Sequence, residues 1–266
     1  MTQLPSSDGP FEEGLATPSV TDRRGFLRGL ACAGGLTLAG LPAARPASAG
    51  IELAAAYPEI LKFDVTRNGS TLGVVMERFG RDGGDAITEV FIDFRVDLAL
   101  ITLYRYEHRS KERWRAGKLV ALDTVTNDNG KAQRVVAKPV ANGLQIDGQS
   151  GRILAPADIL PSSYWHPRFV EQRRMLDSQL GRIVDFTITE VGRETVTALG
   201  RPVDCSRYAM RGGIDLDFWY DDRRVWQKMS FTFKGAVIDY TRVAPTASDS
   251  LRFGAALIDG RRLPSV

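Results

Sequence analysis

The sequence of 266 residues has few of the side chains that bind metals or form cross-links, with 2 cysteines and 2 histidines. Cys32 and Cys205 lie far apart, as do His108 and His166, and none of them has the short spacing typical of zinc, haem or iron–sulfur sites. The sequence therefore predicts neither a metal nor another cofactor. It also predicts a fold that is held by its hydrophobic core rather than by a disulfide bond.

A strong excess of one charge is also missing. The chain has 35 Lys and Arg against 32 Asp and Glu, which gives a net charge of +3, and the two signs are interspersed along the sequence. Nucleic-acid binding needs basic side chains that are clustered on one face. The charge pattern therefore predicts ordinary solvated surfaces and no nucleic-acid partner.

The sequence lacks a hydrophobic run that could span a bilayer, which takes about 20 helical residues. The apolar stretch at 29–41 has 13 residues. It follows Arg23, Arg24, Phe26 and Leu27, and this arrangement resembles the consensus of twin-arginine export signals. An export signal is therefore expected here instead of a membrane span.

We expect residues 1–49 to form this twin-arginine signal peptide. It ends in a small-x-small cleavage site at Ala47 and Ala49, so the mature chain would begin at Gly50. The expected partner during export is the twin-arginine translocase, and the expected destination is the periplasm. A membrane anchor does not fit the short apolar run, and lipid attachment at Cys32 does not fit its position before most of that run.

From Ile60 onward, apolar and polar residues alternate in runs that are separated by Gly, Asn and Asp, a pattern typical of antiparallel hairpins. The expected strands are 61–65, 72–79, 87–98, 100–108, 119–126, 132–140, 144–146, 183–191, 203–211, 214–220, 225–233 and 236–243. A flat sheet of this size would leave long exposed edges. The sequence therefore predicts a mainly β fold with one strongly curved antiparallel sheet, a barrel or half-barrel, over residues 50–243. A loosely ordered tail is expected over 244–266.

The segment 155–181 interrupts the strand pattern. Pro156 and Pro161 mark a loop. After Pro167, four apolar residues lie near helical spacing and predict one short helical insertion: Phe169, Val170, Met175 and Leu176.

Aromatic residues and an imidazole gather immediately before this insertion, at Tyr164, Trp165 and His166. Loops at the mouth of a curved sheet commonly carry binding groups. We therefore regard these three residues, together with Trp114 and Trp219, as candidate ligand-binding residues. The same side chains also suit an ordinary core, in which Trp165 would plug the end of the barrel.

Two pairs of residues are candidates for proton transfer. Ser163 and His166 would suit a hydrolase, although the serine lacks a nucleophile-elbow motif. His108 and Glu112 could share a proton, but the charges that alternate around them favour a solvated strand face. No residue is therefore assigned a catalytic role, and Cys205 is expected to be a small buried apolar residue.

Four short segments resemble an uncharacterised family of exported bacterial proteins with a domain of unknown function. They are Phe63-Asp64-Val65 through Gly69 to Gly73, Glu112-x-Trp114-x-x-Gly117-Lys118-Leu119, Tyr164-Trp165-His166-Pro167 and Trp219-Tyr220-Asp221. The likeness covers residues 60–243. The hairpin order also resembles the lipoprotein-carrier fold, a curved antiparallel half-barrel that helices close around an apolar cavity. This second resemblance implies binding of a lipid or acyl chain in the periplasm.

The sequence as a whole favours an exported, non-enzymatic protein that binds a lipid or another apolar ligand in its curved sheet. Two alternatives stay open. One is a hydrolase-like enzyme with a site around Ser163 and His166, and the other is a structural interaction module of the cell envelope.

Overall fold

The computed structural model describes residues 57–98, 101–254, 257–258 and 261–262, all of which belong to the unit that begins at Pro46. Within these ranges no helix is long and apolar enough to cross a membrane. Several residues of the sequence predictions lie outside the described part of the chain: Arg23, Arg24, Phe26, Leu27, Cys32, Ala47 and Ala49.

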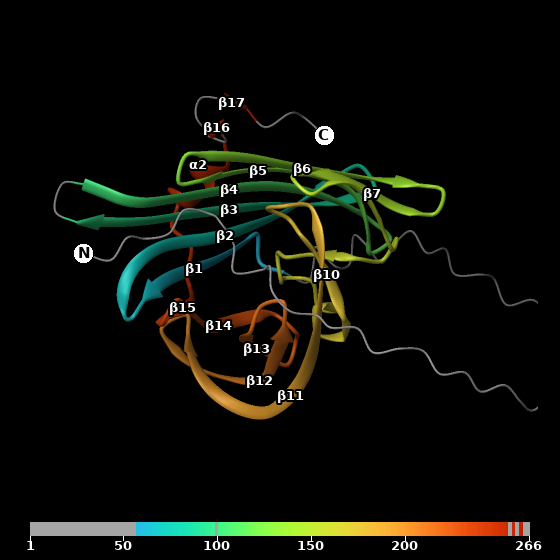
Figure 1. Ribbon diagram of the computed structural model, residues 1–266. Coiled ribbons are helices and arrows are strands. Elements are labelled where there is room, and N and C mark those ends of the chain that lie inside the picture. Colours follow the sequence, from blue (N-terminus) through green and yellow to red (C-terminus); the bar gives the residue numbers. More distant parts are fainter. Residues whose placement is uncertain (1–56, 99–100, 255–256, 259–260, 263–266) are drawn as a thin grey trace, which may run out of the picture. The chain divides into compact units, whose positions relative to one another are not determined.

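A large, curved, open sheet of 15 strands makes up the fold (Figure 1). The strands are β1 (Ile60–Arg67), β2 (Ser70–Asp82), β3 (Asp85–Leu98), β4 (Ile101–Arg115), β5 (Lys118–Asp128), β6 (Lys131–Val140), β7 (Gly143–Gly148), β8 (Gly151–Ala155), β9 (Leu160–Pro161), β10 (Arg174–Asp177), β11 (Arg182–Ala198), β12 (Arg201–Gly212), β13 (Leu216–Tyr220), β14 (Trp226–Phe233) and β15 (Ala236–Val243). Their order in the sheet is β8-β7-β6-β5-β4-β3-β2-β1-β15-β14-β13-β12-β11-β10-β9. The predicted mainly β fold with one curved sheet is thus confirmed.

Hairpins generate this order, because most strands pair with the next strand along the chain. Tight turns support them, and both residues of Asn68-Gly69 and of Asn129-Gly130 have positive φ angles. β15 closes the series by pairing with β1, which places Tyr240 beside Val65. Figure 1 shows β2 to β6 as one long layer, and β11 to β15 curl beneath it. The parallel pair β9 and β10 departs from the antiparallel pattern.

The predicted helix after Pro167 is wrong in its extent. One 3₁₀ turn, η1 (Phe169–Glu171), is present, and Met175 and Leu176 lie in β10. They pair with Val184 and Ile183 of β11. β11 offers an edge whose backbone groups need partners, and this pairing overrides the weak helical spacing. The α-helix of the described residues is α2 (Asp249–Gly254), in the segment predicted to be a loosely ordered tail.

The inward side chains of the sheet form the main core. Its largest fully buried members are aromatic: Trp114, Trp165, Trp226, Phe63, Phe169 and Phe218. On the outer face, Phe253 of α2 packs against Ile60, Met76 and Phe91. Cys205 is fully buried beside Val196 and Trp219 in a separate cluster, so the prediction of a buried apolar residue is confirmed.

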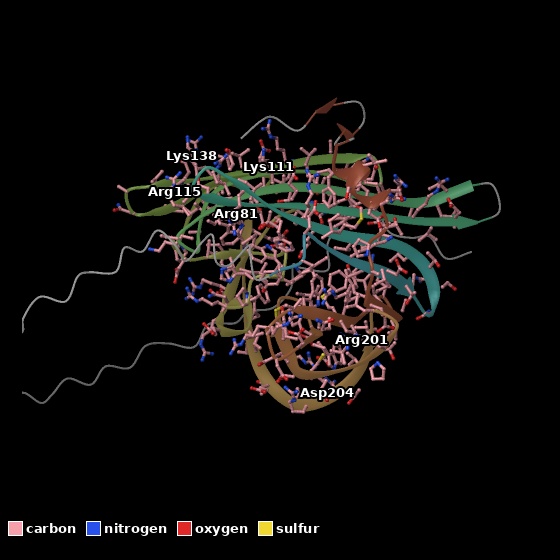
Figure 2. All side chains as sticks on the ribbon, turned by 180° about the vertical axis from the view of Figure 1, so that it is seen from behind. Arg81, Lys111, Arg115, Lys138, Arg201 and Asp204 are labelled. Carbon is pink, nitrogen blue, oxygen red and sulfur yellow. The ribbon has the colours of Figure 1, made fainter. Side chains whose placement is uncertain are left out.

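Charged side chains occupy much of the outer face. Figure 2 shows Arg81, Lys111, Arg115 and Lys138 along the layer of β2 to β6, whereas Arg201 and Asp204 project from the curled part of the sheet. Many of these charges are paired, as in the contact of Arg115 with Asp85 at 2.8 Å. The two short strands β16 (Leu257–Ile258) and β17 (Arg261–Arg262) form a separate ladder.

Candidate functional site

The inner face of β2, β3 and β4 carries two buried carboxyl groups. Cross-strand partners face the same side of a sheet, and the register places Glu112 beside Thr88 and Glu77 beside Val90. Val90 in turn pairs with Ser110, two residues before Glu112 on β4. Both glutamates have 0% exposed surface. The two carboxyl groups therefore enter the interior from strands that are separated by β3.

Residues 162–168, which we call the plug loop, insert between these strands and the curled part of the sheet. The hydroxyl of Tyr57 donates to the carbonyl oxygen of Trp165 at 2.9 Å, and that of Tyr220 donates to the carbonyl oxygen of Tyr164 at 2.8 Å. Tyr164 has a φ of 65°, a left-handed conformation that is strained for a bulky residue. The hydroxyl bonds and the surrounding ring contacts thus hold the loop in a strained shape.

Glu112 accepts hydrogen bonds from two indole rings. Nε1 of Trp114 lies 3.1 Å from Oε2 of Glu112, and Nε1 of Trp165 lies 3.0 Å from the same oxygen. The two indoles meet edge to face, with ring centroids 5.2 Å apart. Trp114 is on the same strand as Glu112, whereas Trp165 is 53 residues away in the sequence. The carboxyl group therefore ties β4 to the plug loop.

Burial controls the charge of both carboxyl groups. It raises the pKa of Glu112 from 4.5 to about 7, while the hydrogen bonds from Trp165, Ser163 and Trp114 act in the opposite direction. Burial also raises the pKa of Glu77 well above its usual value, and the charge of Glu112 raises it further. Both groups are therefore protonated at mildly acidic pH.

His166 lies beside the same indoles, with its ring centroid 5.2 Å from that of Trp114 and 5.3 Å from that of Trp165. Its Nδ1 accepts the backbone N–H of Arg168 at 3.2 Å, so the neutral ring carries its proton on Nε2. Burial lowers the pKa of His166 to about 4, and the charge of Arg168 acts in the same direction. At neutral pH the site therefore contains an uncharged imidazole.

The predicted solvated face for His108 and Glu112 is wrong. Both lie on the inward face of β4, where His108 is 5% exposed and Glu112 is 0% exposed. Nδ1 of His108 is 2.7 Å from Oγ1 of Thr126, and burial lowers the pKa of His108 to about 4. The charged residues that alternate with them, such as Arg113, face outward, and Arg113 pairs with Asp82 at 2.6 Å. The alternation thus reflects the two faces of β4, of which only the outer one is solvated.

A second feature of the inner face is a chain of four aromatic side chains, which we call the aromatic row: Tyr106, Phe94, Tyr240 and Phe231. Successive ring centroids are 5.8, 6.1 and 6.1 Å apart. Three of these residues are half-buried, and Tyr240 is buried. Tyr240 also contacts Trp226 at 6.1 Å, which connects the row to the closed core. The row therefore offers inward apolar surface that the fold leaves partly open.

The structure brings three of the five candidate ligand-binding residues into ring contact, since Trp165 and His166 of the plug loop both lie against Trp114. Tyr164, in the same loop, packs instead against Phe169, Phe218 and Trp226. Trp219 is elsewhere. Its Nε1 donates to Oε2 of Glu194 at 2.9 Å, and it packs with Cys205 on the opposite side of β13 from Phe218. Trp219 therefore belongs to a separate cluster.

Ser163 is 8% exposed and lies close enough to Glu112 to influence its pKa. Among the described residues, no hydrogen bond joins Ser163 to His166, whose Nδ1 is engaged by the backbone of Arg168. A serine–histidine pair, as a hydrolase would need, is not formed in this arrangement. The described ranges also contain no group of three or more His, Cys, Asp or Glu side chains that could hold a metal ion.

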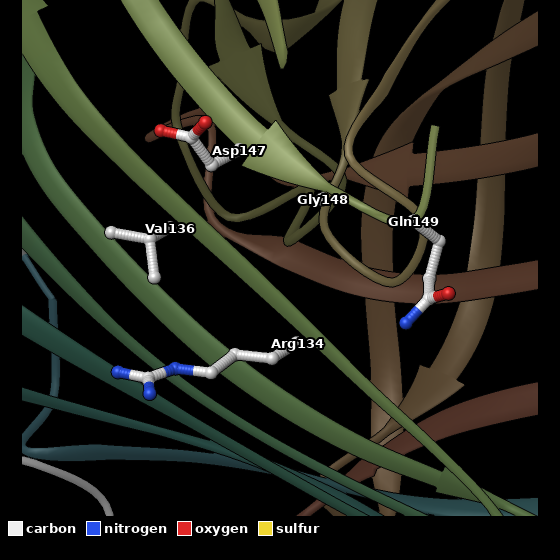
Figure 3. Close-up of a pocket in the computed structure, with 5 residues that line it drawn as sticks. All are labelled: Arg134, Val136, Asp147, Gly148 and Gln149. Carbon is white, nitrogen blue, oxygen red and sulfur yellow. The ribbon is translucent and has the colours of Figure 1, made fainter. Parts of the chain in front are cut away.

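Two depressions lie on the surface, away from the buried carboxyl groups. One has a volume of 390 Å³ and is lined by Arg134, Val136, Asp147, Gly148 and Gln149 (Figure 3). The guanidinium group of Arg134 is already paired with Asp123 at 2.7 Å. The other, of 420 Å³, has a lining of mixed charge that includes Arg78, Glu89 and Lys111. Neither is lined by Trp114 or by residues of the plug loop.

Sequence reasoning missed Glu77 and the aromatic row. Glu77 stands between Val75 and Phe79 at inward positions of β2, which is a signal for burial. However, Val74 and Met76 are apolar as well, so the sequence of β2 does not show which face is inward. The members of the aromatic row come from four different strands, and their proximity depends on the pairing of β1 with β15.

Comparison with known proteins agrees with the fold. A family model described as a domain of unknown function, DUF6134, matches residues 63–243. No match was found among curated protein sequences. A solved structure, the crystal structure of a beta-barrel-like protein of domain of unknown function DUF1849 from Brucella abortus, is similar with a TM-score of 0.51 and 13% identity, over 69% of this chain and 95% of that chain. That likeness concerns the fold alone, and the family match shows that the chain belongs to the DUF6134 family.

Proposed function

We propose that this chain is an exported, non-enzymatic protein of the bacterial cell envelope that binds a lipid or another amphiphilic molecule on the inner face of its sheet. The observation that carries the proposal is the aromatic row, in which three residues are half-buried although their rings pack on the core side of the sheet. Inward apolar surface that the chain does not cover itself is available to an apolar ligand.

The location of the row supports a ligand that lies along the sheet rather than inside a closed cavity. The interior beyond Tyr240 is filled by large side chains, among them Trp226, Trp165 and Phe63. An acyl chain stacked along the four rings would bury apolar area on both partners, at roughly 25 cal/mol per Å². Polar groups flank the row, since the hydroxyl of Tyr106 donates to Gln179 at 3.0 Å. An amphiphile could place its polar end there.

Titration with a fluorescent fatty acid tests the proposal. The double variant Phe94→Ser and Phe231→Ser removes two rings of the row, and we expect the dissociation constant to rise about 10- to 100-fold, as loss of buried aromatic surface predicts. Val237→Ser is the control, because Val237 is 43% exposed and neighbours Ile238 on the opposite face of β15. Equal affinity in the double variant and the wild type would contradict binding at the row.

Export is a separate part of the proposal and rests on the sequence of residues 1–49. The change of Arg23 and Arg24 to lysine preserves the charge but removes the paired arginines of the signal. We expect this variant to accumulate uncleaved in the cytoplasm, whereas Arg28→Lys, which keeps a base at its position, is exported. Cell fractionation with immunoblotting distinguishes the two, and normal export of the double variant would argue against a twin-arginine signal.

A further inference from the structure

Glu77 and Glu112 leave an unusual number of buried acceptors without donors. Both oxygens of Glu77 and Oε1 of Glu112 have no hydrogen-bond partner among the described residues, and nor does the nearby hydroxyl of Ser110. An isolated buried carboxylate costs several kcal/mol of desolvation. Neutral, protonated carboxyl groups avoid most of this cost. The closed arrangement of the interior is therefore compatible with protonated rather than ionised glutamates.

The surrounding groups do not supply a compensating positive charge. The pKa of Glu77 is raised by burial and by the charge of Glu112, and that of Glu112 is set by burial and by uncharged donors, without any Lys or Arg. The hydroxyls of Tyr57 and Tyr220 have pKa values raised by burial, Asp221 and Glu77 act on Tyr57 as further negative charges, and His166 is neutral. His108, which lies on β4 with Glu112, is neutral near pH 7 because burial lowers its pKa to about 4. Glu112 is thus the group of this cluster whose pKa burial brings to about 7, and burial raises the pKa of Glu77 as well.

The plug loop is the part of the site that can respond to such a change. β2, β3 and β4 are each fixed by antiparallel ladders on both sides. The middle of the loop, by contrast, is strained at Tyr164 and is held by single bonds from Tyr57, Tyr220 and the indole of Trp165. Its two ends are anchored separately, by the backbone N–H of Ser162 to Leu176 and by Arg224 to the carbonyl oxygen of Pro167. An ionised Glu112 needs water at its unpartnered Oε1, and movement of the Trp165 indole away from Oε2 would open the interior to that water.

We propose that Glu77 and Glu112 form a buried proton-binding site that acts as a latch: the plug loop stays in the sheet interior while the pair holds its protons, and loss of a proton releases it. The latch is a property of the chain without any ligand, so it does not depend on the proposed lipid binding.

The size of the effect follows from the linkage between protonation and opening. In an opened loop, Glu112 is hydrated and regains its ordinary pKa of 4.5, whereas in the closed loop its pKa is about 7. The ratio of open to closed loop therefore rises up to tenfold per pH unit in this interval, or roughly 300-fold in total. The raised pKa of Glu77 acts in the same direction.

Hydrogen–deuterium exchange between pH 5 and pH 8 tests the latch, once rates are corrected for the intrinsic effect of pH with unfolded peptides. The reporter is a peptide over residues 162–172, and the reference is the β11–β12 hairpin. We expect protection of the reporter to fall by 10-fold or more as pH rises from 5 to 7, while the reference is unchanged. Constant protection of the plug loop over this range would overturn the proposal.

Two variants separate the latch from a general effect of pH. Glu112→Gln keeps a neutral acceptor for both indoles but cannot ionise, so its plug loop should stay protected up to pH 7. Glu107→Gln is the matched control, since Glu107 lies on the outer face of β4 and pairs with Arg105 at 2.9 Å. It should behave as the wild type. The same pH dependence in Glu112→Gln as in wild type would rule out the latch.

A measurement on the wild type alone keeps the proposal testable if Glu112→Gln does not fold. Infrared difference spectra detect the carbonyl stretch of protonated carboxyl groups in an apolar environment. We expect such a band at pH 5 that decreases as pH rises through 7, in parallel with loss of protection in the plug loop. A buried carboxyl signal that is absent at pH 5 would overturn the proposal.

Discussion

Trp165 and Trp219 show how the same hydrogen bond depends on its surroundings. Each indole donates to a glutamate, Trp165 to Glu112 at 3.0 Å and Trp219 to Glu194 at 2.9 Å. Glu112 is fully buried, whereas the side chain of Glu194 is 40% exposed. If the indole donor is removed, water can take its place at Glu194 but has no access to Glu112.

The change of each tryptophan to phenylalanine removes the donor with the same loss of volume. We expect Trp165→Phe to lower the free energy of unfolding by about 1–3 kcal/mol more than Trp219→Phe, because it leaves a buried acceptor poorly satisfied. Urea unfolding of the two variants at pH 6.5 measures the difference. An equal loss in both variants would mean that the bond to Glu112 has no special role.

The plug loop was recognisable from the sequence, but its chemical partner was not. Tyr164, Trp165 and His166 stand out as an aromatic cluster beside a proline, and the structure places them in the interior. The charges that alternate around Glu112 predict a solvated face, but alternation alone does not say which of the two faces of a strand is covered. That information comes from the curvature of the whole sheet, which a local pattern does not contain.

At the scale of the elements, hairpin signals were reliable and short elements were not. The runs that became β1 to β6 and β11 to β15 have turn residues at their ends and enough length to show a period of two. β8 has 5 residues and β9 has 2, too few for a period to appear. The local apolar spacing of β10 predicts a helix. Its strand conformation comes from pairing with β11, a tertiary contact that the local sequence does not show.

Gly73 of β2 lies where the backbone of β3 leaves no room for a side chain. A Cβ atom added there would lie 1.9 Å from the carbonyl oxygen of Asp93, whereas one added at Gly80 would meet nothing within 4 Å. We expect Gly73→Ala to lower the free energy of unfolding by about 3 kcal/mol or more, since backbone must move. Gly80→Ala, on the same strand, should change it by less than about 1 kcal/mol. Thermal unfolding compares the two variants, and similar stabilities would contradict the close approach.

At the scale of the molecule, the buried titratable groups predict an unusual dependence of stability on pH. The folded-state pKa of Glu112 is about 7, above its ordinary value of 4.5, so its contribution to stability is lost as pH rises between these values. The raised pKa of Glu77 contributes a loss of the same sign as pH rises. His108 and His166 have pKa values lowered from 6.5 to about 4, so their contribution is lost as pH falls through that range.

The two sets of groups oppose each other between about pH 4.5 and 6.5, and the carboxyl groups act without the histidines above that range. We therefore expect the free energy of unfolding to fall from pH 6.5 to pH 8, with each titrating carboxyl group contributing up to about 1.4 kcal/mol per pH unit. Urea unfolding at pH 5, 6.5 and 8 measures this profile. A stability that rises from pH 6.5 to pH 8 would be inconsistent with two protonated glutamates in the core.

The mainly β architecture and the single curved sheet were predictable because they depend on local periodicity and turn chemistry. The aromatic row was not, since it requires the first and last long strands to pair. It is also the feature on which the proposed binding role depends, and its partly open rings distinguish it from the filled interior.

Native mass spectrometry of the protein released from the periplasm, without detergent, tests that role most directly. We predict a species heavier than the mature chain by the mass of a lipid, which is released in organic solvent. The adduct should persist in Val237→Ser and be lost from the double variant Phe94→Ser and Phe231→Ser. A wild-type protein that carries no adduct, and that takes up none from added lipid, would contradict the account.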